Sequence, residues 1–331
     1  ISKLDKKRKF VETDFPTENK FNVLTKRKKN DKKPTAFLTI QEGCDKFCTF
    51  CVVPYTRGAE YSRTAMEIIE EAKELIGRGI SELTLLGQNV NAYHGQGYDK
   101  KTSNLADLFY ELSKLDGLKR LRYTTNHPND VNKELIQAHK DIEILMPYIH
   151  LPIQSGSDRM LKLMNRKHTR QSYLEIIEKI REARCDIAIS SDFIVGFPGE
   201  TDSDFEQSLS LINKVNYSQA YSFTYSPRPG TPAADYDHQL PKEIKTERLI
   251  ILQNLLKEQQ LEYNKKFLNS SVSILIEREG KEHNQLVGKS PHSQSVYFNN
   301  IENKSKIGNF AEVHINSVKV SSLSGNVIEK N

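Results

Sequence analysis

The sequence has no long hydrophobic run, few cysteines and no secretory leader pattern, and each of these absences excludes a class of protein. No apolar stretch approaches the roughly 18 residues that a helix needs to span a bilayer, so we expect neither a membrane protein nor a membrane partner. Four cysteines in 331 residues argue against a disulfide-stapled secreted fold and favour a cytoplasmic protein. The chain begins at Ile1 rather than at a methionine, which suggests that further sequence precedes it.

A chain of this length is expected to form two or three domains. Charge is distributed unevenly along it. Residues 1–33 carry a net charge of +7 and residues 265–331 a net charge of +3, whereas the middle of the chain is acidic. Six basic side chains within residues 26–33 would attract a polyanion. A solvated linker is the commoner meaning of such a charge run.

The segment after Pro34 alternates between strand-like and helix-like patterns. This order is typical of parallel strands with helices outside them. Eight such units would close a barrel, so six units predict a partial (β/α)6 parallel barrel. The expected strands are 36–40, 82–86, 118–125, 148–153, 186–195 and 219–226, and the expected helices are 66–76, 105–115, 131–139, 173–183 and 202–215.

The pattern changes after Pro241, where a long helix to about residue 267 leads into five short strand candidates separated by Gly, Asn and Ser. Such a pattern is typical of a small antiparallel β-barrel. We therefore predict a basic linker over 1–29, the α/β core over 30–264 and the small barrel over 265–331. The expected barrel strands are 272–277, 285–288, 295–298, 311–320 and 325–328.

Cys44, Cys48 and Cys51 form a C-x3-C-x2-C motif directly after the first expected strand. A disulfide is disfavoured because it would leave one of the three thiols unpaired. Zinc is disfavoured because it usually takes four ligands and nothing near Cys51 offers a fourth. An iron–sulfur cubane fits better, because thiolates hold such clusters and three of them leave one iron open for a substrate or cofactor. The remaining Cys185 has no partner at a ligand spacing, and we expect it to be a buried small hydrophobe.

The expected strands all end in polar or glycine-rich residues. In parallel barrels the chemistry takes place at the carboxyl ends of the strands. Turn formation would explain one such end, but six on one rim indicate a site. These ends are the cysteine motif and residues 87–91, 126–127, 154–157, 190–200 and 226–230.

The cysteine motif, with an aromatic residue before its last cysteine, resembles that of the radical S-adenosylmethionine (SAM) enzymes. Segments 42–63, 150–169 and 190–201 are similar to the methylthiotransferase branch of that superfamily. The runs CVVPYTRG (51–58) and SPRPGTPAA (226–234) are similar to the MiaB-type members of the branch. The C-terminal barrel resembles the TRAM domain, an RNA-binding module.

This resemblance implies that Cys44, Cys48 and Cys51 hold a [4Fe–4S] cluster whose fourth iron is chelated by SAM. It also implies which side chains surround the SAM molecule. These are Phe50 against the adenine, Gly87, Gln88 and Asn89 at the amino group, Ser191 and Asp192 at the ribose, and Ile194, Gly196 and Glu200 near the adenine.

The same resemblance implies a transferase that methylthiolates carbon 2 of N(6)-dimethylallyladenosine next to the anticodon of a tRNA. Its partners would be the tRNA anticodon loop and an electron donor such as a flavodoxin-type reductant. A second [4Fe–4S] cluster is implied in an N-terminal domain that these 331 residues lack. Two alternatives stay open: a methylthiotransferase acting on an aspartate of ribosomal protein S12, and a non-catalytic metal-bearing RNA-binding module.

Several basic residues are candidates for contacts with phosphate groups or with the carboxylate of SAM. Structural ion pairing and ordinary surface charge are the alternatives for each of them. The candidates are Arg57, Arg63 and Arg228 in the core and Lys289, Lys304 and Lys306 in the small barrel.

Overall fold

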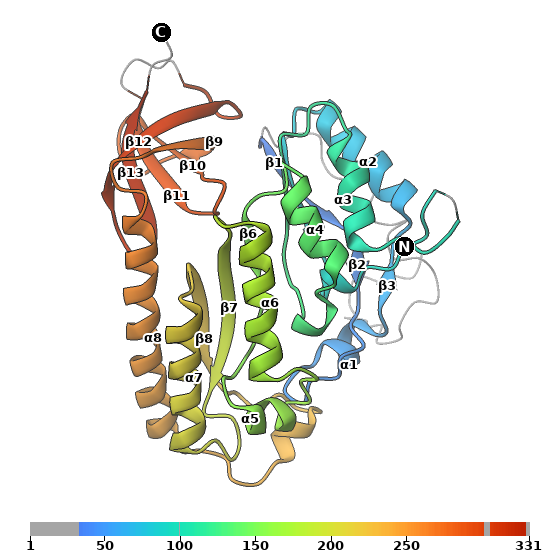
Figure 1. The fold of residues 1–331 in the computed structure, drawn as a ribbon, viewed down its shortest axis with the longest axis vertical. Coiled ribbons are helices and arrows are strands. Elements are labelled where there is room, and N and C mark those ends of the chain that lie inside the picture. The colour runs from blue at the N-terminus through green and yellow to red at the C-terminus, as the bar shows by residue number, and fades with distance from the viewer. Residues whose placement is uncertain (1–32, 99, 301–304, 329–331) are drawn as a thin grey trace, which may run out of the picture. The chain divides into compact units, whose positions relative to one another are not determined.

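The computed structural model describes residues 33–98, 100–300 and 305–328, so the linker expected over 1–29 lies outside it. Two three-stranded parallel sheets, with the orders β1-β4-β5 and β6-β7-β8, are joined by a parallel bridge between Leu121 and Leu145. The six strands therefore follow one another around a partial barrel, and the predicted fold class is confirmed (Figure 1). The strands are β1 (Thr35–Thr39), β4 (Glu82–Leu86), β5 (Arg120–Tyr123), β6 (Tyr148–His150), β7 (Ala188–Val195) and β8 (Gln219–Thr224).

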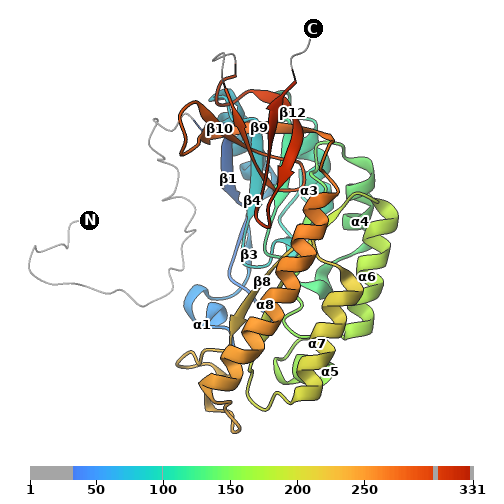
Figure 2. The same ribbon diagram turned by 90° about the vertical axis from the view of Figure 1, so that its left-hand side faces the viewer.

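Helices follow the core strands and cover one side of them, as Figure 2 shows for α4, α6 and α7. A Ser, Thr or Asn side chain caps the first turn of each helix from α2 to α7 and so satisfies an amide that the helix leaves free. No helix among the described residues is long and apolar enough to cross a membrane. The helices are α2 (Ala65–Gly77), α3 (Leu105–Ser113), α4 (Lys133–Asp141), α5 (Asp158–Leu163), α6 (Arg170–Ala183), α7 (Asp202–Val215) and α8 (Lys242–Lys265).

The core strands have an apolar face toward the helices and a polar face toward the inside of the partial barrel. In β5, Leu121 and Tyr123 belong to the main hydrophobic core, whereas Arg120 and Arg122 alternate with them. This alternation follows from the two-residue period of a strand. It leaves the interior of the partial barrel available for polar chemistry.

Three short elements lie around the cysteine motif and were not expected from the sequence. They are β2 (Gln41–Glu42), which pairs with β3 (Tyr61–Ser62), and α1 (Val53–Arg57). The six-residue α5 was also not expected. Elements this short carry too few periodic residues to be recognised from their pattern.

The C-terminal strands close into a five-stranded barrel in the order β10-β11-β13-β12-β9. The barrel was predicted, but one of its pairs corrects the expectation of a wholly antiparallel sheet, because β11 and β13 are parallel. The reason is geometric, since directions cannot alternate all the way around a closed ring with an odd number of strands. The strands are β9 (Ser271–Glu279), β10 (Gln285–Lys289), β11 (Ser295–Asn299), β12 (Phe310–Val318) and β13 (Ser322–Val327).

Two buried arginines of β5 join the small barrel to the core. Arg120 donates to the carbonyl oxygens of Lys289 (2.7 Å) and Ser273 (2.9 Å), and Arg122 donates to those of Pro291 (2.8 Å) and Ser290 (2.7 Å). Glu82 of β4 lies 3.0 Å from Arg122 Nε and balances part of their charge. Burial and the neighbouring Arg122 lower the pKa of Arg120 to about 10. Because Arg120 begins β5, the small barrel packs where the core strands start, opposite the end from which the cysteines emerge.

Candidate active site

The three cysteines lie on a loop that leaves the carboxyl end of the first strand and leads into α1. The loop turns at Gly43, whose φ of +75° favours glycine, and a Cβ there would lie 2.1 Å from the carbonyl oxygen of Ala59. Cys48 is buried, and Cys44 and Cys51 are half-buried. The motif is therefore folded into a tight loop at the rim of the partial barrel.

The thiols lie within electrostatic reach of one another. Burial raises the pKa of Cys44 to about 11, and the charges of Cys48 and Cys51 add to the shift. Burial also raises the pKa of Cys51, again with a contribution from Cys48. Because neighbouring negative charges add to the effect of burial at Cys44 and Cys51, a bound cation would favour their thiolate forms. The donor set fits a metal cluster bound through three thiolates.

Zinc and an iron–sulfur cluster make different demands on such a loop. Zinc draws its ligands into one tetrahedron, whereas a cubane distributes its thiolates over separate iron atoms. Across the part of the chain that the structure describes, no group of three or more His, Cys, Asp and Glu side chains is placed to hold one metal ion.

Gln41 connects the cysteine loop to the loop after β4. Its Oε1 accepts hydrogen bonds from the amides of Gln88 (2.9 Å) and Asn89 (3.0 Å), and its Nε2 donates to the carbonyl of Gly43 (2.9 Å). Gln88 Oε1 in turn accepts from the amide of Gly43 (2.7 Å). A Cβ at Gly87 would lie 2.5 Å from Gln41 Oε1, so glycine is required for this approach. Three residues expected at the SAM amino group are thereby held beside the cysteines.

A second connection involves the loop after β5. Asp130 accepts from Lys46 of the cysteine loop (2.7 Å) and from the side-chain amide of Asn89 (2.8 Å). The amide oxygen of Asn89 is buried and has no hydrogen-bond partner among the described residues. A buried oxygen of this kind is costly unless a donor reaches it, so the site presents an acceptor to a ligand.

The opposite flank of the cysteine loop is apolar. Phe50 and Ile194 pack against one small hydrophobic cluster, although 144 positions separate them in the sequence. Gly196 has a φ of +70°, and its amide donates to Glu200 Oε2 (2.7 Å). The residues expected near the adenine of SAM therefore lie around one apolar patch. The buried members of the cluster are Met160, Met164, Phe197, Tyr225 and Ala233.

Glu200 shapes the glycine-containing loop from within. Besides the amide of Gly196, its Oε2 accepts from the buried Arg248 of α8 (2.6 Å). Burial raises the pKa of Glu200, and the two hydrogen bonds act in the opposite direction. The carboxylate is thus occupied by the protein itself, which makes Glu200 a residue that positions Gly196.

The two residues expected at the ribose lie on different faces of β7. Ser191 Oγ donates to the carbonyl of Leu151 (3.0 Å) and accepts from the amide of Ile153 (3.1 Å), so its hydroxyl is engaged within the scaffold. Asp192 lies 3.3 Å from His150 Nε2. Only Asp192 of this pair presents its side chain toward the interior of the partial barrel.

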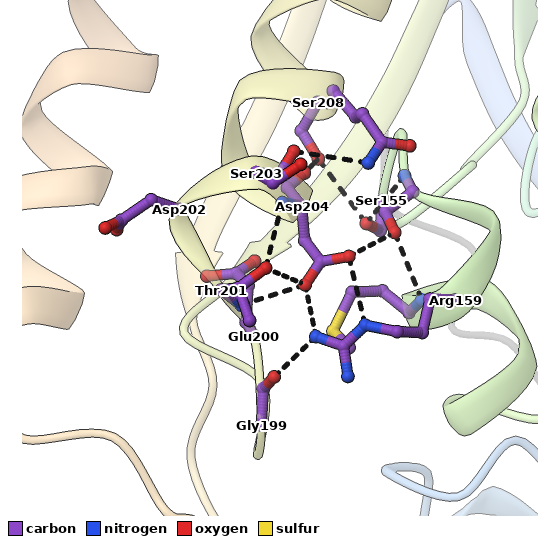
Figure 3. A network of polar contacts seen from close by, with 12 residues as sticks. Ser155, Arg159, Gly199, Glu200, Thr201, Asp202, Ser203, Asp204 and Ser208 are labelled. Carbon is purple, nitrogen blue, oxygen red and sulfur yellow. Dashed lines mark hydrogen bonds and ion pairs between the residues drawn. The ribbon is translucent and has the colours of Figure 1, made fainter.

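A polar network fastens the loops that follow β6 and β7 (Figure 3). Asp204, in the first turn of α7, accepts from Ser157 Oγ (2.6 Å) and Thr201 Oγ (2.6 Å) and pairs with Arg159. Burial alone would raise the pKa of Asp204, but the hydrogen bonds from Arg159, Ser157 and Thr201 outweigh it and hold the pKa well below its usual range. Arg159 also donates to the carbonyl of Gly199 (2.7 Å). The network fixes the rim beside the glycine-containing loop.

Some candidates have other roles or positions. Arg63 is buried, donates to the carbonyl of Thr39 and pairs with Glu71 (2.7 Å). These contacts favour structural ion pairing over a contact with phosphate or with the carboxylate of SAM. Cys185 corrects the expectation of a buried side chain, because it is exposed in the turn before β7. That strand begins at residue 188 rather than at 186, which leaves the cysteine outside the core. Arg57, Arg228 and Lys306 are exposed, Lys289 is half-buried, and Lys304 lies outside the described residues.

Sequence reasoning missed Gln41 and two aromatic residues of β8. Tyr221 and Phe223 are 46% and 55% exposed, and in the sheet register they lie beside Asp192 and Ile194. Strands usually bury such side chains, so their exposure on an edge strand beside the site indicates a contact surface. In the sequence, they were indistinguishable from core residues of a strand.

Family models match both parts of the chain. The model of the radical SAM superfamily matches residues 38–212, and that of the TRAM domain matches residues 265–328. Coproporphyrinogen III oxidase from Escherichia coli, a radical SAM enzyme, shares the fold with a TM-score of 0.50 and 16% identity over 69% of this chain and 53% of its own. The partial barrel and its cysteine loop thus define a radical SAM protein with a C-terminal TRAM domain.

More similar relatives are tRNA-2-methylthio-N(6)-dimethylallyladenosine synthases. The protein of that name from Bartonella tribocorum is 52% identical over all of this chain and 72% of its own length. Those from Bartonella quintana and Rickettsia conorii are 54% and 51% identical over 97% and 99% of this chain and 70% and 74% of their own lengths. The chain belongs to the tRNA-2-methylthio-N(6)-dimethylallyladenosine synthase family.

Proposed function

We propose that this chain contains the catalytic core of a transferase that methylthiolates carbon 2 of N(6)-dimethylallyladenosine next to the anticodon of tRNA. One observation carries the proposal: a three-cysteine loop lies at the rim of a radical SAM barrel in a chain 52% identical to a synthase of that name. The core extends over residues 30–264, and the TRAM domain over 265–331 supplies affinity for RNA. A tRNA substrate supports a cytoplasmic location.

Cys44, Cys48 and Cys51 hold the [4Fe–4S] cluster in this proposal. When bound, the cluster and SAM supply a radical that removes hydrogen from carbon 2, a position from which no side chain is basic enough to take a proton. The chain's own residues keep this site in shape. Gln41 fixes the turn before the first cysteine, and the contacts that Lys46 makes with Asp130 fix the loop between the first two cysteines.

SAM is placed between the two flanks of the cysteine loop. The side-chain oxygen of Asn89, which has no partner among the described residues, can accept a hydrogen bond from the amino group of SAM. Gly87 and Gln88 lie beside it. The apolar patch at Phe50 and Ile194, with the turn at Gly196, suits the adenine. Asp192 suits the ribose hydroxyls, because a carboxylate accepts two hydrogen bonds from a diol. The hydroxyl of Ser191 is engaged by Leu151 and Ile153, so the ribose contact in this proposal is made by Asp192.

The RNA substrate meets the open edge of the partial barrel at β8. Bases of a single-stranded loop can be splayed out and stacked on aromatic side chains. Tyr221 and Phe223 offer two such faces beside the SAM contacts, and Phe47 and Tyr55 offer two more beside the cysteines. Exposed basic residues such as Arg57, Arg228 and Lys306 suit the phosphates.

The sulfur must come from a group other than these three cysteines, because their thiolates are committed to the first cluster. The family resemblance suggests a second [4Fe–4S] cluster as the source of sulfur and a flavodoxin-type protein as electron donor. We therefore expect this chain alone to cleave SAM to 5′-deoxyadenosine and methionine without forming methylthio-tRNA. Without a carrier, the sulfur cannot be positioned within reaction distance of the carbon.

Hydrogen transfer tests this function without depending on the sulfur donor. The reconstituted chain is reduced anaerobically and given SAM with tRNA whose dimethylallyladenosine carries deuterium at carbon 2. We expect deuterium in the 5′-deoxyadenosine, measured by mass spectrometry. The Cys44→Ala variant should lose the cluster and this transfer, whereas the matched Cys185→Ala variant should retain both.

The other two functions make different predictions in the same assay. A methylthiotransferase for ribosomal protein S12 would transfer deuterium from a peptide labelled at its aspartate and not from tRNA. A non-catalytic RNA-binding module would bind zinc in place of four irons and release no 5′-deoxyadenosine. Either result would replace the proposed function.

A further inference from the structure

Arg166 is a buried guanidinium without a carboxylate partner. It follows α5, is only 8% exposed, and forms no ion pair among the described residues. Its Nη2 donates to the carbonyl of Pro152 (2.6 Å), its Nη1 lies 3.6 Å from Cys48 Sγ in donating geometry, and its Nε has no partner in the described part of the chain. A cation buried with neutral partners alone is costly, so the position calls for a nearby anion.

The backbone around Arg166 is fastened to the cysteine loop. Thr49 donates through its hydroxyl to the carbonyl of Leu163 (2.9 Å) and through its amide to that of Met164 (3.1 Å). Asn165 donates back to the carbonyl of Phe47 (2.8 Å). These three bonds hold the backbone just before Arg166 against the loop, and the hydrogen bond to the carbonyl of Pro152 orients the guanidinium itself.

Among the described residues, the titratable groups nearest to Arg166 do not balance its charge. Burial and the nearby Arg166 lower the pKa of His127 to about 2, and the same two causes lower that of His168 to about 3, so both rings are neutral. Asp130 is already engaged by Lys46 and Asn89. The positive charge of Arg166 also acts on Cys51, where it opposes the rise in pKa that burial causes. With a cluster bound, the thiolates of the cysteine loop supply the negative charge next to Arg166.

We propose that Arg166 is the counter-charge of the iron–sulfur cluster and raises its reduction potential. The proposal rests on the cluster of the proposed function and adds a role for a residue that no sequence motif assigned. When one electron enters the cluster from a donor, the cluster gains one negative charge and no bond in the protein changes. A fixed cation that donates to a ligand sulfur stabilises the reduced form more than the oxidised form, because the reduced form carries more negative charge.

The test is a redox titration of the reconstituted chain, followed by the EPR signal of the reduced cluster. At the midpoint potential of the unmodified chain, we expect Arg166→Met to lower the ratio of reduced to oxidised cluster by about tenfold, which corresponds to about 59 mV for a one-electron couple. Arg166→Lys keeps the charge and should recover most of the loss. The matched control is Arg181→Met, which removes a guanidinium that donates to the carbonyl of Val215, away from the cysteines.

The remaining outcomes are also decisive. An unchanged midpoint potential in an Arg166→Met variant that binds four irons would overturn the proposal. If Arg166→Met loses iron while Arg166→Lys retains it, the role of the charge is supported; equal loss in both variants would overturn it, because lysine preserves the charge. If the unmodified chain binds no [4Fe–4S] cluster, it is the proposed function that fails.

Discussion

Gln41 makes three hydrogen bonds from a fully buried position between the first strand and the cysteine loop. Its carbonyl and amide groups face two different loops, so one side chain sets the distance between the cysteines and residues 88–89. An apolar side chain of similar size would fill the same space and leave two backbone amides and one carbonyl without partners. The residue therefore determines the geometry of the site without belonging to any ligand set.

We expect Gln41→Leu to lower the free energy of unfolding by about 3 kcal/mol, because three buried polar groups lose their partner. The affinity for SAM should fall as well, since the loop expected at its amino group loses its anchor. Urea unfolding and equilibrium binding measure the two effects. Gln137→Leu, at an exposed position of α4, is the control; equal losses in the two variants would contradict this account.

His139 gives a second prediction at the scale of one residue. It is buried, its Nε2 lies 2.6 Å from Tyr123 Oη, and burial with the nearby Arg184 lowers its pKa from 6.5 to about 3. The unfolded chain therefore binds a proton that the folded chain excludes, and stability is lost as the pH falls from about 6.5 toward 3. Between pH 6.5 and pH 5 this group should cost about 2 kcal/mol. His139→Gln should flatten that slope in urea unfolding; an unchanged slope would show that the proton binds elsewhere.

The junction between the core and the TRAM domain depends on charges in β4 and β5. Glu82, Arg120 and Arg122 are all buried. The two arginines donate hydrogen bonds to four carbonyl oxygens of the TRAM domain. Removing the TRAM domain would remove these four hydrogen bonds and leave the two arginines paired with Glu82. The two folding units are therefore not independent modules joined by a helix, although the sequence boundary near residue 264 suggests that they are.

We expect Arg122→Met to lower the free energy of unfolding by about 3 kcal/mol, because it leaves the buried Glu82 with half of its compensation. In a double-mutant cycle, the Glu82→Gln and Arg122→Met changes together should cost clearly less than the sum of the single changes. Arg78→Met, which removes an exposed ion pair with Glu74, should cost less than about 1 kcal/mol. Additive effects at positions 82 and 122 would mean that the two charges are not coupled.

The elements of the core were predictable where the pattern was long and local. The helix expected over 202–215 coincides with α7, and the strand expected over 82–86 coincides with β4, because periodic side chains and a capping box mark them. The contacts of Arg120 and Arg122 were not predictable. Their partners are main-chain carbonyls some 150 residues further along the chain, and a carbonyl has no signature in the sequence.

The site was predictable in the same uneven way. The cysteine spacing predicts a metal-binding loop, which stays a prediction, and the structure has that loop after the first strand, as the barrel pattern led us to expect. The face on which Ser191 lies depended on the pleat of β7, which is set only when neighbouring strands pair. Gln41 contacts the site across the fold, and its local sequence gives no sign of it. Arg166 lies within segment 150–169, which matches the family, but that segment does not predict its contact with Cys48.

At the scale of the whole molecule, the proposed function assigns RNA recognition to aromatic surfaces of the core and to the TRAM domain. We expect the double variant Tyr221→Ala/Phe223→Ala to weaken tRNA binding by about 1–3 kcal/mol for each base that loses a stacking partner. The slope of log affinity against log salt should stay the same, because no phosphate contact is removed. Tyr110→Ala, on the helical side of the molecule, is the control. Unchanged affinity in the double variant would exclude β8 from the substrate contact.

The attachment of the TRAM domain at the start of the core strands has a consequence for the length of RNA that could contact both parts of the protein. In the proposed function, chemistry takes place where the strands end, so an RNA bound by both parts has to extend over the length of β8, whose six residues span about 20 Å. The length of the core strands would then set the distance between the modified base and the part of the RNA that the TRAM domain binds. A hairpin trimmed to the loop alone would still reach the radical but fall short of the TRAM domain, and the enzyme would discriminate against it by length, whatever its sequence.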